Sequence, residues 1–331
     1  MLQQTRVETV IPYYERFVKI FPTVRSLARS PLSRVLQVWA GLGYYARARH
    51  LHEAARAIFR NLGGRIPSQK EDLQRLPGLG PYTAGAVASI AFGEPQAALD
   101  GNVTRVISRL FALNASPPAT PGQKKQLERL AESLIPADRA SDFNQALMDL
   151  GAMVCLPARP RCSVCPVRRI CIGKGKALTS RKGQKKKPRE EEWLIAVIER
   201  EGRYFLFLNE KTGLLSGLWQ FPTKMVEMRE RPIWKTRTNG KERGLLKEKV
   251  KDEFGMEIQV QTPLPQQKYL FTHISATLKP YLCSLVGLGN DPPSHPKARW
   301  VKPTNFSRYP ISTAMRKIAA LLPKTREKRL K

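Results

Sequence analysis

The sequence contains few acidic residues and no long apolar run. Against 57 Lys and Arg there are only 27 Asp and Glu, so the 331-residue chain has a formal charge of +30 and a pI near 10.4. A positive surplus of this size repels itself unless an anionic partner is bound, and nucleic acid is the commonest such partner. No segment approaches the roughly 20 apolar residues that a membrane-spanning helix needs, and the start, MLQQTRVETV, has no apolar signal core. We therefore expect a soluble intracellular protein.

Cysteine is also scarce, but four of the five cysteines fall in one short run, CLPARPRCSVCPVRRIC. An odd total argues against a disulfide framework, and clustered thiols indicate a metal. The spacing is C-x6-C-x2-C-x5-C, whereas structural zinc sites usually have two short pairs. A loop around one [4Fe–4S] cluster fits this spacing better, with zinc as the alternative. The predicted ligands are Cys155, Cys162, Cys165 and Cys171.

Hydrophobic patterning divides the chain into two parts, and the predicted fold class is α+β. Residues 1–173 show apolar side chains at helical spacing, and the cysteine loop 155–171 ends this all-α part. Residues 174–192 form a basic, almost apolar-free linker. From 193 to 322 the pattern changes to short strands around one helix that ends at Gly255, and 323–331 is a basic tail. Cys283 lies in a strand-like segment and is predicted to be a small buried residue.

Two short motifs in the helical part are suited to DNA chemistry. In LPGLGPYTA (76–84), Gly78 and Gly80 precede a helix, where free N–H groups can bind a phosphate. Alone, such a turn is more often a simple helix connection. In LDGNV (99–103), Asp100 precedes a Gly turn, and in isolation its commonest role is to cap a helix.

Together with the four-cysteine run, these two motifs resemble those of the helix-hairpin-helix DNA glycosylases of the endonuclease III superfamily. The closest resemblance is to the MutY-type adenine DNA glycosylases. Supporting stretches are MLQQTRVETVIPYYERF, WAGLGYYARARHLH and FNQALMDLGAMVC in the helical part, and TGLLSGLWQFP and FTHISATLKPY in the second. The second part resembles the C-terminal domain of that family, a Nudix-like 8-oxoguanine recognition domain. The resemblance implies base excision repair, with a [4Fe–4S] cofactor and, as partner, double-stranded DNA that carries A:8-oxoguanine or A:G mispairs. It also implies a cytoplasmic, nucleoid-associated monomer.

The resemblance assigns roles to residues in the helical part. Asp100 matches the carboxylate that stabilises positive charge on the sugar, and Asn102 and Tyr82 match polar groups beside it. Tyr82 stands where lyase-active relatives have a Lys, which implies a monofunctional glycosylase. The residues matching those that hold or read the DNA are Gln4, Tyr44, Gly78, Gly80 and Gln145. Without the resemblance, Tyr44 is simply an aromatic residue at a helix start.

The family's general acid, a Glu, stands two residues before the Met of MLQQT, and here that Met is Met1. Glu8 falls at an ordinary helix position and is not expected to replace it. The alternatives are a start codon assigned too late and a truncated, disabled protein. General acid–base help contributes roughly 10²–10⁴-fold, so the chain as written is expected to bind DNA but hardly to excise adenine.

In the C-terminal part, the segment Glu248–Met256 departs from the metal-binding Nudix helix at its first two positions, so recognition rather than hydrolysis is expected. Phe271-Thr272-His273 resembles the family's Phe-Ser-His loop, which contacts 8-oxoguanine. Taken alone, His273 is a residue at a strand end that hydrogen-bonds to backbone. Two alternative functions remain: an endonuclease III-like glycosylase/AP lyase, and a DNA-binding protein without catalysis.

Overall fold

The computed structural model describes residues 1–3, 5–113, 120–174, 187–211, 213–227, 239–271, 273–286 and 297–323. The chain forms two compact units, Met1–His52 with Lys187–Lys331, and Glu53–Lys186. Gln4, Thr272, most of the predicted linker and nearly all of the predicted tail lie outside the described residues. No described helix is long and apolar enough to cross a membrane.

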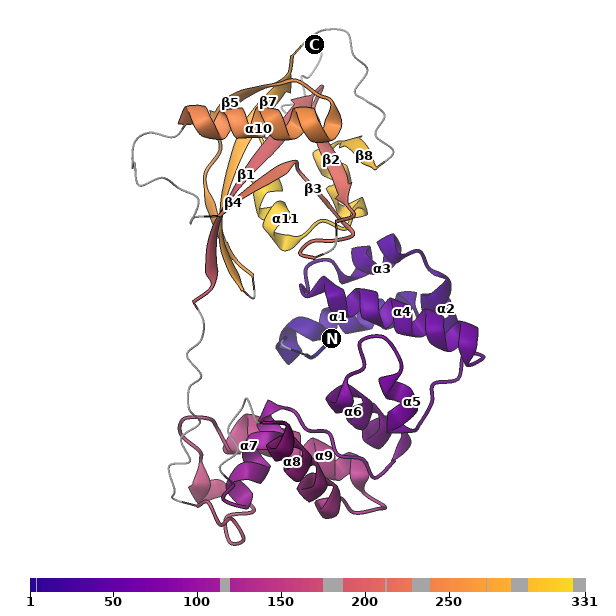
Figure 1. Ribbon diagram of the computed structural model, residues 1–331. Helices are drawn as coiled ribbons and strands as arrows, with labels where there is room; N and C mark the ends of the chain where they lie inside the picture. Colours follow the sequence, from indigo (N-terminus) through magenta and orange to yellow (C-terminus); the bar gives the residue numbers. More distant parts are fainter. Residues whose placement is uncertain are drawn as a thin grey trace, which may run out of the picture. The chain divides into compact units, whose positions relative to one another are not determined.

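The helical part follows the predicted pattern (Figure 1). Its helices are α1 (Val7–Ile20), α2 (Val24–Arg29), α3 (Leu32–Trp39), α4 (Tyr45–Asn61), α5 (Lys70–Gln74), α6 (Pro81–Phe92), α7 (Gly101–Leu110), α8 (Pro121–Leu134) and α9 (Ala140–Asp149). A π-helical turn, η1 (Leu150–Val154), continues α9, and a 3-10 turn, η2 (Cys162–Val164), lies in the cysteine loop. The apolar segment 27–43 is broken at Ser30, which is extended (φ −68°, ψ 144°), because the following Pro31 disfavours helical backbone before it.

The C-terminal part is a mixed sheet with helices, as predicted. The strands are β1 (Arg189–Arg200), β2 (Arg203–Asn209), β3 (Leu218–Gln220), β4 (Thr223–Glu227), β5 (Ile258–Pro263), β6 (Gln267–Leu270), β7 (Ile274–Leu285) and β8 (Ala298–Val301). The main order is β3-β2-β1-β7-β5, with β1 parallel to β7, while β4, β6 and β8 pair with β1, β7 and β2. The helices are α10 (Asn239–Phe254), a 3-10 turn η4 (Pro303–Arg308) and α11 (Thr313–Ala319). β1 begins four residues inside the segment predicted as linker.

The core of this sheet lies under α10, where Leu246, Val250 and Phe254 meet β1, β2 and β7. The helix ends as predicted, because Gly255 takes a left-handed φ of 65° and its N–H donates to the Lys251 carbonyl at 2.8 Å. Cys283 is 1% exposed, and burial raises the pKa of its thiol to about 12, which confirms the prediction of a small buried residue.

Candidate active site and DNA-contacting residues

Asp100 is the N-cap of α7. Its Oδ1 accepts a hydrogen bond from the Val103 N–H at 2.7 Å, so the capping role expected from sequence is confirmed. The other carboxylate oxygen has no hydrogen bond among the described residues, and the side chain is half-buried. Burial, and then the nearby charge of Asp100, raise the pKa of the Tyr82 phenol. The structure thus brings a partly free carboxylate close to a neutral phenol.

Asn102 is bonded to a different partner: its Oδ1 accepts a hydrogen bond from Nη2 of Arg105 at 2.8 Å. The same guanidinium donates to the carbonyls of Gly151 (2.7 Å) and Cys155 (2.8 Å). Gly151 is required in this contact, because a Cβ there would lie 2.8 Å from the Asn102 Cβ. Arg105 therefore fixes the first turns of α7 to η1 and to the start of the cysteine loop.

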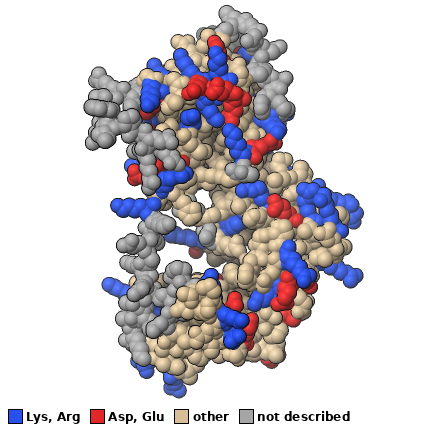
Figure 2. Space-filling view, viewed as in Figure 1, with Lys and Arg blue, Asp and Glu red and all other residues tan. Residues whose placement is uncertain are grey.

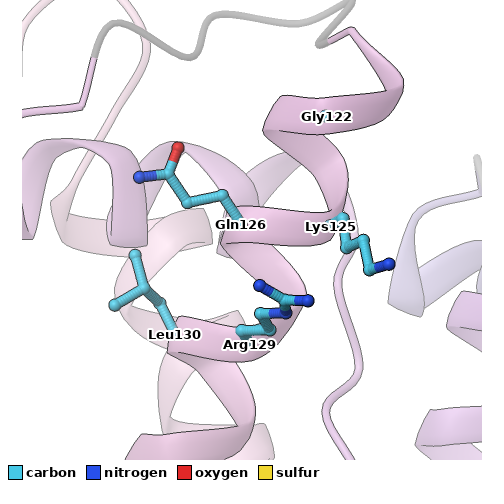
Figure 3. Close-up of a pocket in the computed structure, with 5 residues that line it drawn as sticks. All are labelled: Gly122, Lys125, Gln126, Arg129 and Leu130. Carbon is cyan, nitrogen blue, oxygen red and sulfur yellow. The ribbon is translucent and has the colours of Figure 1, made fainter.

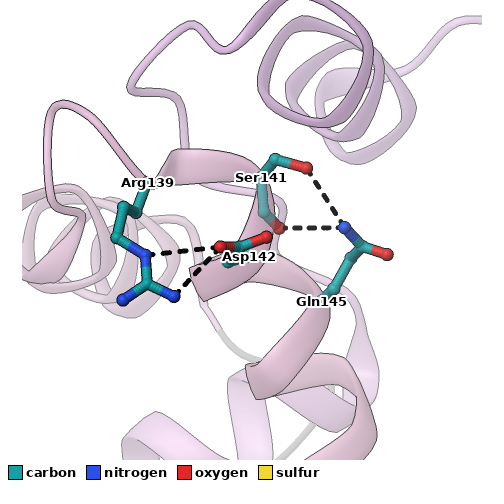
Figure 4. Close-up of polar contacts among 4 residues, drawn as sticks. All are labelled: Arg139, Ser141, Asp142 and Gln145. Atoms are coloured by element: carbon teal, nitrogen blue, oxygen red, sulfur yellow. Dashed lines mark hydrogen bonds and ion pairs between the residues drawn. The ribbon is translucent and has the colours of Figure 1, made fainter.

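Gln145 projects from α9 beside Ser141, as Figure 4 shows. Its Nε2 donates to the Ser141 Oγ at 3.1 Å and to the Ser141 carbonyl at 3.4 Å, which leaves Oε1 unengaged by the described residues. The buried Asn144 next to it accepts from the Ala98 N–H at 3.1 Å and donates to the Gln96 carbonyl at 2.9 Å. Asn144 thereby fixes α9 against the segment that leads into Asp100.

The glycine turn before α6 has two different glycines. Gly78 has a φ of 76°, which only glycine adopts readily, whereas Gly80 has an ordinary φ of −74°. A Cβ at Gly80 would meet no protein atom within 4 Å, and no side chain caps α6. Neither backbone conformation nor packing inside the protein thus requires glycine at position 80.

The cysteine loop is anchored to α7 at both ends by Arg109. Its guanidinium donates to the Cys155 Sγ (3.3 Å) and to the Leu156 carbonyl (2.6 Å), while its own carbonyl accepts from the Gly173 N–H (2.9 Å). Burial raises the pKa of the Cys171 thiol, and the charges of the other three loop cysteines raise it further. The hydrogen bond with the Gly173 N–H acts in the opposite direction.

All four loop cysteines are free, half-buried thiols within electrostatic reach of one another. By number and softness they suit a four-thiolate iron–sulfur or zinc group. Among the described residues, however, no three His, Cys, Asp or Glu side chains converge as a metal-ligand group. The donor set is present, but the ligand geometry is not assembled.

Tyr44 belongs to the first unit. Its side chain is 42% exposed, its φ is 49°, and it begins the tight turn into α4 after Gly41 and Gly43, both with positive φ. An exposed aromatic ring on a left-handed residue is not explained by core packing. The role of Tyr44 in contacting DNA stays a prediction.

The segment after β6 is closed by the Phe271 N–H, which donates to the Ile274 carbonyl at 2.8 Å. The Phe271 ring stacks on the buried Trp193 at 4.9 Å and tilts against Tyr269 at 4.7 Å. His273 is exposed, and its carbonyl accepts from the Arg189 N–H at 2.9 Å. The backbone bond is the one expected at a strand end, and it leaves the imidazole directed to solvent.

Near the end of α10, the carboxylate of Glu253 is engaged by two lysines. Glu253 pairs with Lys249 (3.0 Å) and Lys211 (2.8 Å). Burial opposes the ionisation of Glu253, but the hydrogen bonds from both ammonium groups outweigh it and lower the pKa below its usual value. Each oxygen of this carboxylate thus pairs with a lysine ammonium group.

Basic side chains are widespread on the surface. Figure 2 shows Lys and Arg gathered over α2, whereas α10 carries both signs of charge. A pocket of about 340 Å³ lies along one face of α8 (Figure 3) and is lined by Gly122, Lys125, Gln126, Arg129 and Leu130. None of the predicted site residues lines this pocket.

Comparison with known proteins defines the class and then the family. Residues 1–137 match the model of the HhH-GPD superfamily base excision DNA repair proteins, and residues 194–321 match the NUDIX domain. The chain is thus a helix-hairpin-helix base excision repair protein with a Nudix-like domain. Over 96% of its length it is 36% identical to the adenine DNA glycosylases of Homo sapiens and Rattus norvegicus, of which it covers 66% and 69%. The chain belongs to the adenine DNA glycosylase family and spans about two thirds of the length of these relatives.

Several residues that hold the site together were not found from sequence. Arg105, Arg109 and Asn144 each bond to backbone 46 or more residues away. The signal for Asn144 was its place within the FNQ motif. The arginines gave no signal, because arginine is common throughout this chain.

Proposed function

We propose that this chain hydrolyses the N-glycosidic bond of adenine paired with 8-oxoguanine or guanine in double-stranded DNA. The observation that carries the proposal is the partly free carboxylate of Asp100, held at a helix N-terminus next to Tyr82. The departing base leaves positive charge on the sugar, and a fixed carboxylate lowers the barrier to this charge. The Tyr82 phenol cannot form a Schiff base, so strand cleavage is not expected.

Adenine must leave the stack before it can be cleaved, at a cost of a few kcal/mol. We assign the reading of its edge to Gln145. With Nε2 bound to Ser141, the outward Oε1 is ready to accept from the N6 amine of adenine. Tyr44 and Gln4 hold the opened duplex, and the exposed ring of Tyr44 supports its part in this.

The glycine turn binds a DNA phosphate in this proposal. Position 80 lacks a side chain although none would clash within the protein, so a close external partner explains the glycine. The uncapped N–H groups of α6 and the N-terminal end of its dipole favour a phosphate at this place. On the other strand, Thr272 and His273 contact the opposite base, and Phe271, which precedes them in the sequence, is fixed by stacking on Trp193.

The cofactor in this proposal is a [4Fe–4S] cluster held by Cys155, Cys162, Cys165 and Cys171, which the spacing of the four cysteines favours over zinc. When bound, it would tie the loop together and supply no step of the hydrolysis. The purified protein is expected to absorb visible light and to contain about four irons. Cys165→Ser should lose this absorbance, whereas the buried Cys283→Ser should keep it; zinc in place of iron would refute the assignment.

A formal charge of +30 favours duplex DNA as the partner and a monomer that is associated with the nucleoid in the cytoplasm. Light scattering should give the mass of one chain. Binding to DNA should weaken steeply as salt rises.

The decisive experiment is single-turnover adenine release from a duplex with A opposite 8-oxoguanine. It is run on the 331-residue chain, on a version extended upstream through a Glu, and on Asp100→Asn in the extended version. We expect Asp100→Asn to slow adenine release by about 10²-fold or more relative to the same version with Asp100 intact. Release that is equally fast without Asp100 would refute the assigned mechanism. Tight binding with no release in any version would favour a lesion-binding protein, and nicking of abasic DNA would favour the lyase.

A further inference from the structure

We propose that Arg47 is a positioning residue that holds the two duplex-contacting elements of the first unit, the Tyr44 turn and the segment around Gln4, in one arrangement. The inference rests on the proposed function. Arg47 lies in the first turn of α4, three residues after Tyr44, and its side chain is half-buried. Its contacts are divided between the two elements.

Toward the N-terminal segment, both terminal nitrogens of the guanidinium donate hydrogen bonds. Nη1 donates to the carbonyls of Met1 (3.0 Å) and Gln3, and Nη2 donates to the Thr5 Oγ1 at 3.2 Å. Gln3 and Thr5 flank Gln4 in the sequence, so Arg47 fixes the backbone on both sides of that residue. The Thr5 Oγ1 also donates to the Gln3 carbonyl at 3.4 Å, so two of the groups that accept from Arg47 are bonded to each other.

Toward the turn, the same guanidinium lies over two aromatic rings. Its Cζ is 4.9 Å from the centre of the Tyr44 ring and 5.7 Å from that of the buried Trp39. Trp39 is in turn fixed by its Nε1, which donates to the Gly43 carbonyl at 3.0 Å. A planar guanidinium with five N–H donors can bond to three acceptors and lie over a ring at the same time, which the compact ammonium of lysine cannot match.

The consequence concerns base opening more than DNA affinity. An exposed ring on a left-handed residue can point in several directions, and the overlying cation selects one of them before DNA arrives. Pre-ordering the ring and the Gln4 segment removes part of the entropy cost of opening the duplex. Loss of Arg47 should therefore leave phosphate binding nearly intact and lower the fraction of opened base pairs.

The test uses 2-aminopurine in place of the target adenine, opposite 8-oxoguanine, because its fluorescence rises when the base leaves the stack. Relative to wild type, Arg47→Met is expected to lower the unstacked fraction about tenfold, with duplex affinity within about twofold of the control. The matched control is Arg56→Met, which removes the same charge from an exposed position of the same helix. Arg47→Lys keeps the charge and should lower the unstacked fraction as much as Arg47→Met does. It replaces Arg47→Met in the test if that variant unfolds at the assay temperature.

A double-mutant cycle separates this inference from the proposed function. If Arg47 acts through Tyr44, adding Arg47→Met to Tyr44→Ala should lower the signal much less than in wild type. The inference would be overturned if Arg47→Met and Arg47→Lys both gave the same unstacked fraction as Arg56→Met. If Tyr44→Ala alone leaves the signal unchanged, the proposed role of Tyr44 fails instead.

Discussion

Replacing Arg105 with Met tests the link between α7 and the cysteine loop most directly. The change removes three hydrogen bonds, to Asn102, Gly151 and Cys155, of 2.7 to 2.8 Å. Bonds from a charged donor contribute about 1.5–3 kcal/mol each, but water can replace part of each bond at this half-buried site. We therefore expect the unfolding free energy of the second unit to fall by about 2–3 kcal/mol, or Tm by about 6–12 °C.

The same loss should release the turn that carries Asn102 and loosen the N-terminal end of α7, where Asp100 sits. Single-turnover excision should slow by about tenfold or more, while duplex affinity stays nearly constant, since the lost hydrogen bonds are made within the protein and hold the turn that follows Asp100. Thermal unfolding and rapid-quench kinetics measure the two effects. Arg129→Met, an exposed arginine of α8 in the same unit, is the control. If Arg105→Met and this control differ by less than about 0.5 kcal/mol in unfolding free energy, the reasoning is refuted.

Three further changes have defined outcomes. Gly85→Ala places a Cβ 2.2 Å from the Ala97 carbonyl oxygen, so it should force α6 away from that segment and cost about 2–4 kcal/mol in denaturant unfolding. Burial, and then the neighbouring Asp100 carboxylate, raise the pKa of the Tyr82 phenol. Above about pH 10 the unfolded chain therefore loses the phenol proton while the folded protein keeps it. The free energy of unfolding relative to Tyr82→Phe should accordingly fall as pH rises above about 10. Ser141→Ala frees the Gln145 amide and should lower the preference for adenine over unsubstituted purine by about two- to threefold in competition assays.

Each of these outcomes can be contradicted. A Gly85→Ala protein as stable as wild type would mean that α6 and the Ala97 segment separate without cost. A stability difference between wild type and Tyr82→Phe that is constant from pH 8 to above pH 10 would show an unperturbed phenol. An unchanged base preference in Ser141→Ala would show that Gln145 is oriented by some other contact.

The sequence by itself determined the family, the class of fold and the local geometry. Apolar spacing predicted the helices and strands, because each depends on side chains only a few residues apart. The cap by Asp100 and the end of α10 at Gly255 were readable for the same reason, since both are closed within one helical turn. The cysteine spacing named the donor set, although the described structure does not assemble it.

Only the tertiary structure decided what holds these parts together. Arg105 meets backbone 46 to 50 residues away, Arg47 reaches back 42 to 46 residues, and Asn144 bonds to the chain ahead of Asp100. Such contacts depend on the path of the whole chain, which no spacing rule encodes, and an arginine that positions a site is indistinguishable in sequence from the many that lie on the surface. Likewise, packing requires glycine at position 151 but not at position 80. The difference follows from which atoms lie beside each Cα, and the tertiary packing determines those atoms.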